Sequence, residues 1–124
     1  MSLFSAIKKF FKPQYTPLIC SPHDIFDLVE ECIEIDAPIC RLVIEHEGVR
    51  YQFGVTADYS SKLGFFDVMY YLDNDEYTDF DQFKREAKIN GKYLLDLGTI
   101  AVIEDVDAGD PRSNKLLAQR EIKY

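Results

Sequence analysis

Alternating apolar and polar positions between residues 38 and 72 predict three antiparallel strands. The stretch contains three runs rich in β-branched and aromatic residues, separated at Glu47-Gly48 and at residues 58–64. Runs of this kind, broken by residues that favour turns, are typical of an antiparallel meander. The rest of the chain contributes shorter and less regular patterns, so this meander is the centre of the expected fold.

Each run also predicts how its strand faces the core. Apolar residues occupy Cys40, Leu42 and Ile44 in the first run, and every second position from 49 to 57 in the second run. Side chains alternate between the faces of a strand, so one face of each strand should be buried. The third run, residues 65–72, is apolar in both rows, which predicts a central strand or one with a covered outer face.

The predicted helices surround the meander. Ser21 is the expected N-cap of a helix that has Pro22 in its first position and continues to about residue 33. A second helix is expected over residues 79–87, with Thr78 as its N-cap. The Asn90-Gly91 pair suits either a type I′ hairpin or a helix stop. We favour the helix stop, followed by a short helical turn over residues 93–97.

Residues 99–106 are β-branched and predict a fourth strand, and residues 112–124 predict a terminal helix. The inner row of that strand is either Ile100, Val102 and Glu104 or Ala101 and Ile103. The fold class is therefore α+β. We expect about four strands in a mostly antiparallel sheet, with the meander at 38–72 and a further strand at 99–106, and helices mainly on one face.

The first thirteen residues predict an amphipathic helix that precedes a single domain at 14–124. Three lysines lie opposite the apolar stripe or in the last turn, and Pro13 ends the helix. An isolated helix of this length is marginal in water, so its apolar side should be buried. It would contact its own domain, another copy of the chain or, weakly, an anionic membrane surface. The apolar stripe consists of Leu3, Phe4, Ile7, Phe10 and Phe11.

The charge of the chain limits its partners. The 124 residues carry a net charge of −8, and residues 21–83 hold fifteen acidic residues against three basic ones. This balance argues against direct nucleic-acid binding, which needs a basic surface. No apolar run is long enough for a transmembrane span, and no signal peptide is evident. Three cysteines without a C-x-x-C pair predict reduced thiols, so we expect a cytoplasmic protein.

The acidic residues gather in two segments, and tyrosines lie in the meander and in the second of these segments. The predicted helix at 21–33 has no basic residue among its acids, and residues 73–81 contain five carboxylates. Tyrosine and complementary charge are both favoured at protein interfaces. We therefore expect a non-catalytic module that binds a basic protein, such as an antagonist or immunity-type protein for a nucleic-acid-binding enzyme. The candidate contact residues are Asp27, Glu30, Glu31, Glu34, Asp73, Asp75, Glu76, Tyr77 and Asp79.

Motifs for catalysis or for a metal are missing from the sequence. The acids of residues 73–84 do not match an EF-hand loop, and no phosphate-binding, dinucleotide-binding or zinc-protease motif occurs. Cys20 with His23, or Cys40 with His46, would lack a third orienting group. We expect no cofactor and no metal. One alternative function is peripheral attachment to a membrane or scaffold through the amphipathic N-terminal helix. Another is an enzyme or small-ligand binder with a pocket at the edge of the sheet.

Overall fold

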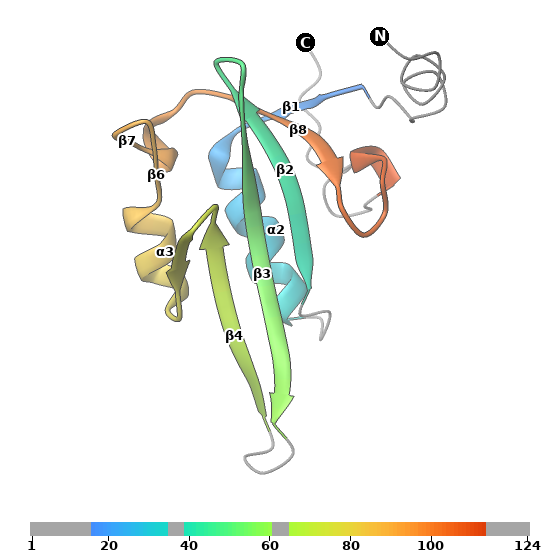
Figure 1. Ribbon diagram of the computed structural model, residues 1–124, viewed down its shortest axis with the longest axis vertical. Coiled ribbons are helices and arrows are strands. Elements are labelled where there is room, and N and C mark those ends of the chain that lie inside the picture. The colour runs from blue at the N-terminus through green and yellow to red at the C-terminus, as the bar shows by residue number, and fades with distance from the viewer. Residues whose placement is uncertain (1–15, 35–38, 61–64, 114–124) are drawn as a thin grey trace, which may run out of the picture.

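The computed structural model describes residues 16–34, 39–60 and 65–113, which form an antiparallel sheet with helices packed against it (Figure 1). The main sheet has six strands. They are β1 (Leu18–Cys20), β2 (Cys40–His46), β3 (Val49–Ser60), β4 (Phe65–Leu72), β5 (Asp75–Tyr77) and β8 (Ile100–Asp105). Their order across the sheet is β1-β8-β2-β3-β4-β5, and every neighbouring pair is antiparallel.

The predicted meander is confirmed as β2, β3 and β4. Cys40 pairs with Val55 and Leu42 with Phe53, so the predicted apolar rows of β2 and β3 share one face. All four of these residues are buried. The turn between the two strands places Glu47 at a φ of 51° and Gly48 at 79°, the left-handed values that a tight hairpin requires.

The α+β class is confirmed, but the sheet has six strands rather than about four. The two additional strands are β1 and β5, which lie outside the four runs predicted to be strands. Each has three residues, too few to show a period of two. The placement of the helices mainly on one face of the sheet stays a prediction. The helices expected at 2–12 and 112–124 lie outside the described residues, apart from residues 112 and 113.

Helix α2 (Pro22–Glu34) begins where the sequence predicts. The carboxylate of Asp24 accepts hydrogen bonds from the backbone N–H and the hydroxyl of Ser21, at 3.0 and 3.1 Å. These bonds fix the first turn. The buried side of α2 then meets the sheet through Phe26, whose ring centroid lies 5.3 Å from that of Phe53 on β3.

Helix α3 (Phe80–Glu86) is capped by Asp79 and not by Thr78 as predicted. The Asp79 carboxylate accepts the backbone N–H of Gln82 at 2.9 Å, the bond by which an N-cap satisfies a free donor of the first turn. The cap therefore lies one residue later than the sequence pattern suggested. The ring of Phe83 on α3 stacks on that of Phe53 at 5.2 Å.

The predicted helix stop at Asn90-Gly91 is wrong, and the hairpin alternative is correct. Strands β6 (Lys88–Ile89) and β7 (Lys92–Tyr93) pair with each other. Asn90 and Gly91 have φ values of 53° and 78°, as a type I′ turn requires. The 3₁₀ helix η1 (Leu94–Asp96) follows, within the stretch predicted to form a short helical turn.

A β-bulge decides which residues of β8 face the core. Its register against β2 shifts between Val43 and Ile44, so Val102 pairs with Ile44 but Glu104 pairs with Val43. The extra residue in β8, Ile103, reverses the alternation of inward and outward side chains beyond it. The buried row is consequently Ile100, Val102 and Asp105, and neither of the two predicted rows is complete. A second 3₁₀ helix, η2 (Pro111–Ser113), follows this strand.

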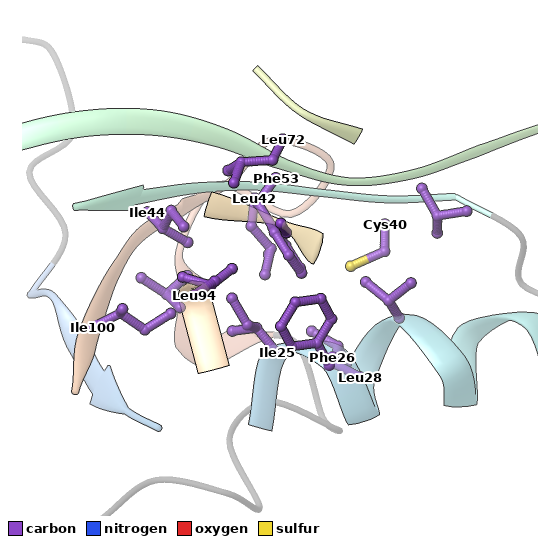
Figure 2. Close-up of a cluster of buried hydrophobic side chains, with 14 of the residues drawn as sticks. Ile25, Phe26, Leu28, Cys40, Leu42, Ile44, Phe53, Leu72, Leu94 and Ile100 are labelled. Atoms are coloured by element: carbon purple, nitrogen blue, oxygen red, sulfur yellow. The ribbon is translucent and has the colours of Figure 1, made fainter. Parts of the chain in front are cut away.

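The core lies between α2 and the inner row of the sheet (Figure 2). Phe26, Phe53 and Phe83 form its centre, with ring centroids 5.2 to 5.3 Å apart. Tyr70 of β4 extends this cluster, since its ring stacks on that of Phe83 at 5.6 Å. The aromatic cluster therefore connects α2, β3, β4 and α3.

Candidate interaction surface

The outward side of α2 carries the first group of predicted contact residues. Glu30 is exposed, and Asp27 and Glu31 are partly buried. Each lies about half a turn from a fully buried residue of α2, namely Ile25, Leu28 or Val29. The side chain of Glu34, also a candidate, lies outside the described residues. The period of α2 thus separates its apolar contacts with the core from a row of carboxylates.

The second group lies between the end of β4 and the start of α3. The four acidic candidates of this segment are exposed, and Tyr77 is partly buried. This segment is the β4–β5 hairpin and the approach to α3, so it lies along one edge of the main sheet (Figure 1). Its acids are Asp73, Asp75, Glu76 and Asp79.

The two groups meet at Tyr70. Burial raises the pKa of the Tyr70 hydroxyl, and the negative charges of Asp79 and Glu30 raise it further. Ring contacts support this placement. The ring of Phe26, one turn before Glu30 on α2, lies 6.5 Å from that of Phe80, the residue after Asp79. The Phe80 ring in turn lies 5.5 Å from that of Tyr70. The fold therefore brings the acidic side of α2 and the acidic start of α3 to the same tyrosine.

A second tyrosine continues this surface. Tyr77 pairs with Tyr70 across β4 and β5. Burial is also the main cause that raises the pKa of Tyr77, followed by the charges of Asp75 and Glu86. Glu86 was not among the predicted residues. Its spacing was a usable signal, since it follows Asp79 by seven residues and so lies two turns further along α3.

The rings beneath both hydroxyls hold them in place. The Tyr77 ring lies 5.4 Å from that of Phe83, and the Tyr70 ring lies 5.5 Å from that of Phe80. Packed aromatic rings of this kind lose little conformational entropy when a partner binds. The two tyrosine rings are therefore preorganised.

Two predicted residues are separated from this surface. The Asp73 carboxylate accepts the backbone N–H of Gln52 at 2.7 Å, and the Asp73 N–H donates to the Gln52 carbonyl at 2.8 Å. Asp73 thus fastens the β4–β5 turn to β3. Glu76 pairs with Tyr71, whose neighbours Tyr70 and Leu72 are buried, so alternation directs Glu76 to the opposite face of the sheet.

We define the acidic surface as Tyr70 and Tyr77, the four carboxylates that raise their pKa values, and Asp27 on the outward side of α2. The candidates Glu31 and Glu34 are not included. Within the described ranges, none of the carboxylates in the acidic surface forms an ion pair with a lysine or arginine. The recorded ion pairs lie elsewhere and join Arg41 to Asp107, His46 to Glu47, and Arg50 to Glu45. The acidic surface comprises Asp27, Glu30, Tyr70, Asp75, Tyr77, Asp79 and Glu86.

The cysteines do not resemble activated nucleophiles. All three are buried. Burial, with a smaller effect of Asp24, raises the pKa of Cys20 to about 12. The pKa of Cys40 is raised by its hydrogen bond with Cys32 and by burial. A reactive cysteine needs the opposite shift, toward the thiolate.

A surface hollow of about 590 Å³ lies along α3, β7 and η1. Its lining includes Lys84, Arg85, Glu86 and Asp96, together with the ring of Tyr93. Charges of both signs are thus mixed around an open hollow, which does not define one class of ligand. Among the described residues, no group of three or more histidine, cysteine or acidic side chains is arranged to hold a metal ion.

Comparison with known proteins gives no match to a family model, to a curated protein or to a solved structure. The described helices include none with the length and apolar character needed to span a membrane. The predicted stripe at Leu3, Phe4, Ile7, Phe10 and Phe11 lies outside the described residues, and its membrane or oligomer contacts stay a prediction. The expected cytoplasmic location also stays a prediction.

Proposed function

We propose that this protein is a non-catalytic module that binds a basic protein through the acidic surface. The observation that supports this function is the convergence of Glu30 and Asp79 on Tyr70. Two acidic segments that are distant in the sequence contribute to one surface, and the tyrosines in it rest on a rigid aromatic core. Scattered solubility charges would not need this arrangement.

The chemistry of the surface favours a cationic partner. Carboxylates that have no ion pair in the described chain would gain one from lysine or arginine at an interface. Complementary charge of this kind raises association rate constants, up to about 10⁸–10⁹ M⁻¹s⁻¹ at low salt. Tyr77, which is only partly buried, adds the ring of a residue type enriched among energetically important contacts.

An antagonist or immunity-type role follows from the same charge. A nucleic-acid-binding enzyme carries a basic surface because it must displace counterions from phosphates. An acidic protein that covers this surface would compete directly with the nucleic acid. The partner class we propose is therefore a basic nucleic-acid-binding protein, bound at its nucleic-acid surface.

Capture experiments with matched charge variants test this function. The full chain, immobilised, is exposed to lysate of its source organism at low and high salt, and bound proteins are identified by mass spectrometry. The test variant is Glu30→Gln/Asp79→Asn. The control is Glu76→Gln/Glu104→Gln, which changes the net charge equally but lies on exposed positions outside the acidic surface.

We expect one stoichiometric basic protein that is retained by the wild type and by the control. It should be lost from the test variant and released as salt screens the interface. The purified partner should then show at least tenfold weaker binding to the test variant. Equal weakening by both double variants, or binding that is insensitive to salt, would rule out the acidic surface as the binding site.

A further inference from the structure

The second face of the sheet carries an apolar patch that neither α2 nor α3 covers. In Figure 1, α2 lies behind β2 and β3, so the face toward the viewer is the one opposite α2. On β1, β8 and β2 the buried residues belong to the inner row, and alternation places their neighbours on this outer face. Four residues on this face, Ile19, Val43, Ala101 and Ile103, form what we call the outer apolar patch. Ile19 is 38% exposed, and the other three are partly buried.

We propose that residues 2–12 of the same chain form an amphipathic helix that packs on the outer apolar patch. The connectivity supports this occupant. The described chain begins at Thr16 and enters the sheet through the edge strand β1, where Leu18 pairs with Val102. The segment before β1 therefore arrives beside Ile103 and Glu104.

The lengths agree. Eleven helical residues span about 16 Å, and crossing from β1 to β3 covers three strand spacings, or about 14 Å. The five residues between the segment and β1 can extend to about 17 Å. The helix can therefore lie across β1, β8 and β2 without strain in its connection.

The side chains of the proposed helix are also complementary to those of the outer apolar patch and its edge. The stripe of Leu3, Ile7 and Phe10 matches the apolar patch, in which the small residue Ala101 leaves room for larger rings. Lys8, Lys9 and Lys12 lie on the other side of the helix or in its last turn. The edge of the patch offers Glu104, which is exposed and has no ion pair among the described residues.

A single tryptophan reports on this docking, because the chain contains none. In full-length Phe10→Trp protein without lipid, we expect blue-shifted emission that does not depend on protein concentration. Adding Val43→Asp in the patch should shift the emission toward that of exposed tryptophan. The matched control is Val49→Asp at an exposed position of the opposite row, which is 51% exposed. It should leave the emission unchanged.

Zero-length carbodiimide cross-linking gives a second test that needs no substitution in the core or the patch. We expect intramolecular links from Lys8, Lys9 or Lys12 to Glu104, mapped by mass spectrometry, and their loss in Glu104→Gln. Emission of exposed tryptophan in Phe10→Trp would overturn the proposal. A blue shift that needs anionic vesicles would overturn it in favour of a membrane contact. A blue shift that grows with protein concentration would overturn it in favour of a second copy.

Discussion

Gly54 shows how one residue sets the geometry of the sheet. It lies in β3, where it pairs with Arg41 on one side and Tyr71 on the other. A Cβ added at this position would lie 1.9 Å from the Cys40 carbonyl oxygen and 3.1 Å from the Cα of Arg41. Both atoms belong to the backbone of β2. They cannot move away without breaking the ladder that holds the meander.

We therefore predict that Gly54→Ala lowers the free energy of unfolding by about 3 kcal/mol, at the upper end of the usual cost of overpacking. Gly98→Ala is the control, because a Cβ there would meet no atom within 4 Å. It should change the stability by less than about 1 kcal/mol. Urea unfolding of both variants checks the prediction. Equal costs for the two substitutions would contradict it.

Tyr70 gives a prediction about pH. Its pKa is raised in the folded protein, first by burial, and the unfolded chain releases the same proton near pH 10. The unfolded state therefore loses this proton first, and the stabilisation present below pH 10 is lost as pH rises through the folded pKa. Tyr70→Phe keeps the ring and removes the hydroxyl. Its unfolding free energy should fall less steeply above pH 10 than that of the wild type, as urea midpoints can measure.

Asp79 has two roles, because its carboxylate both caps helix α3 and belongs to the acidic surface. Asp79→Ala removes the acceptor of the Gln82 N–H and should cost about 1 kcal/mol of stability. Asp79→Asn keeps an acceptor, since asparagine caps helices about as well as aspartate. Both variants should bind the partner more weakly, but only Asp79→Ala should lose stability. Equal stability of the two in urea would show that the cap contributes nothing.

The elements that sequence could predict are those with a local and repeated signal. The meander was predictable because its runs of seven or more residues are rich in β-branched and aromatic residues and are separated by turn residues, with a period of two in the first two runs. Helix α2 was predictable because Ser21, Pro22 and Asp24 mark its first turn. Strands β1 and β5 were not, since three residues obtain their conformation from the strands they pair with. The set of β8 residues that face the core depends on a β-bulge against β2. This bulge arises from the pairing of the two strands and is not visible in the sequence of β8 alone.

The candidate site was predictable in its parts but not in its assembly. The acidic character of α2 and of the segment after β4 is visible in the sequence. Their convergence on Tyr70 is not, because it requires the order of β4, β5 and α3 in space. The same applies to Glu76, a predicted contact residue that strand alternation directs to the other face. The hydrogen bond that ties the Asp73 carboxylate to Gln52 on β3 is likewise a tertiary effect.

At the scale of the whole molecule, the acidic surface should cost stability in the absence of a partner. The chain carries a net charge of −8, and like charges in one surface repel each other. Glu30→Gln should therefore raise the free energy of unfolding by about 0.5 kcal/mol at low salt, the size of an exposed pair interaction. The gain should vanish at about 1 M salt, where the Debye length is near 3 Å.

Glu45→Gln distinguishes this effect from a general benefit of lower charge. It makes the same change in net charge, but Glu45 lies 3.5 Å from Arg50 in an ion pair. Its loss should leave stability unchanged or slightly lower at low salt. Thermal unfolding of both variants at low and high salt measures the difference. If the two variants gain equally, the repulsion belongs to the net charge of the molecule. If only Glu30→Gln gains, the repulsion is local, as expected for a surface that retains destabilising charges because a partner needs them.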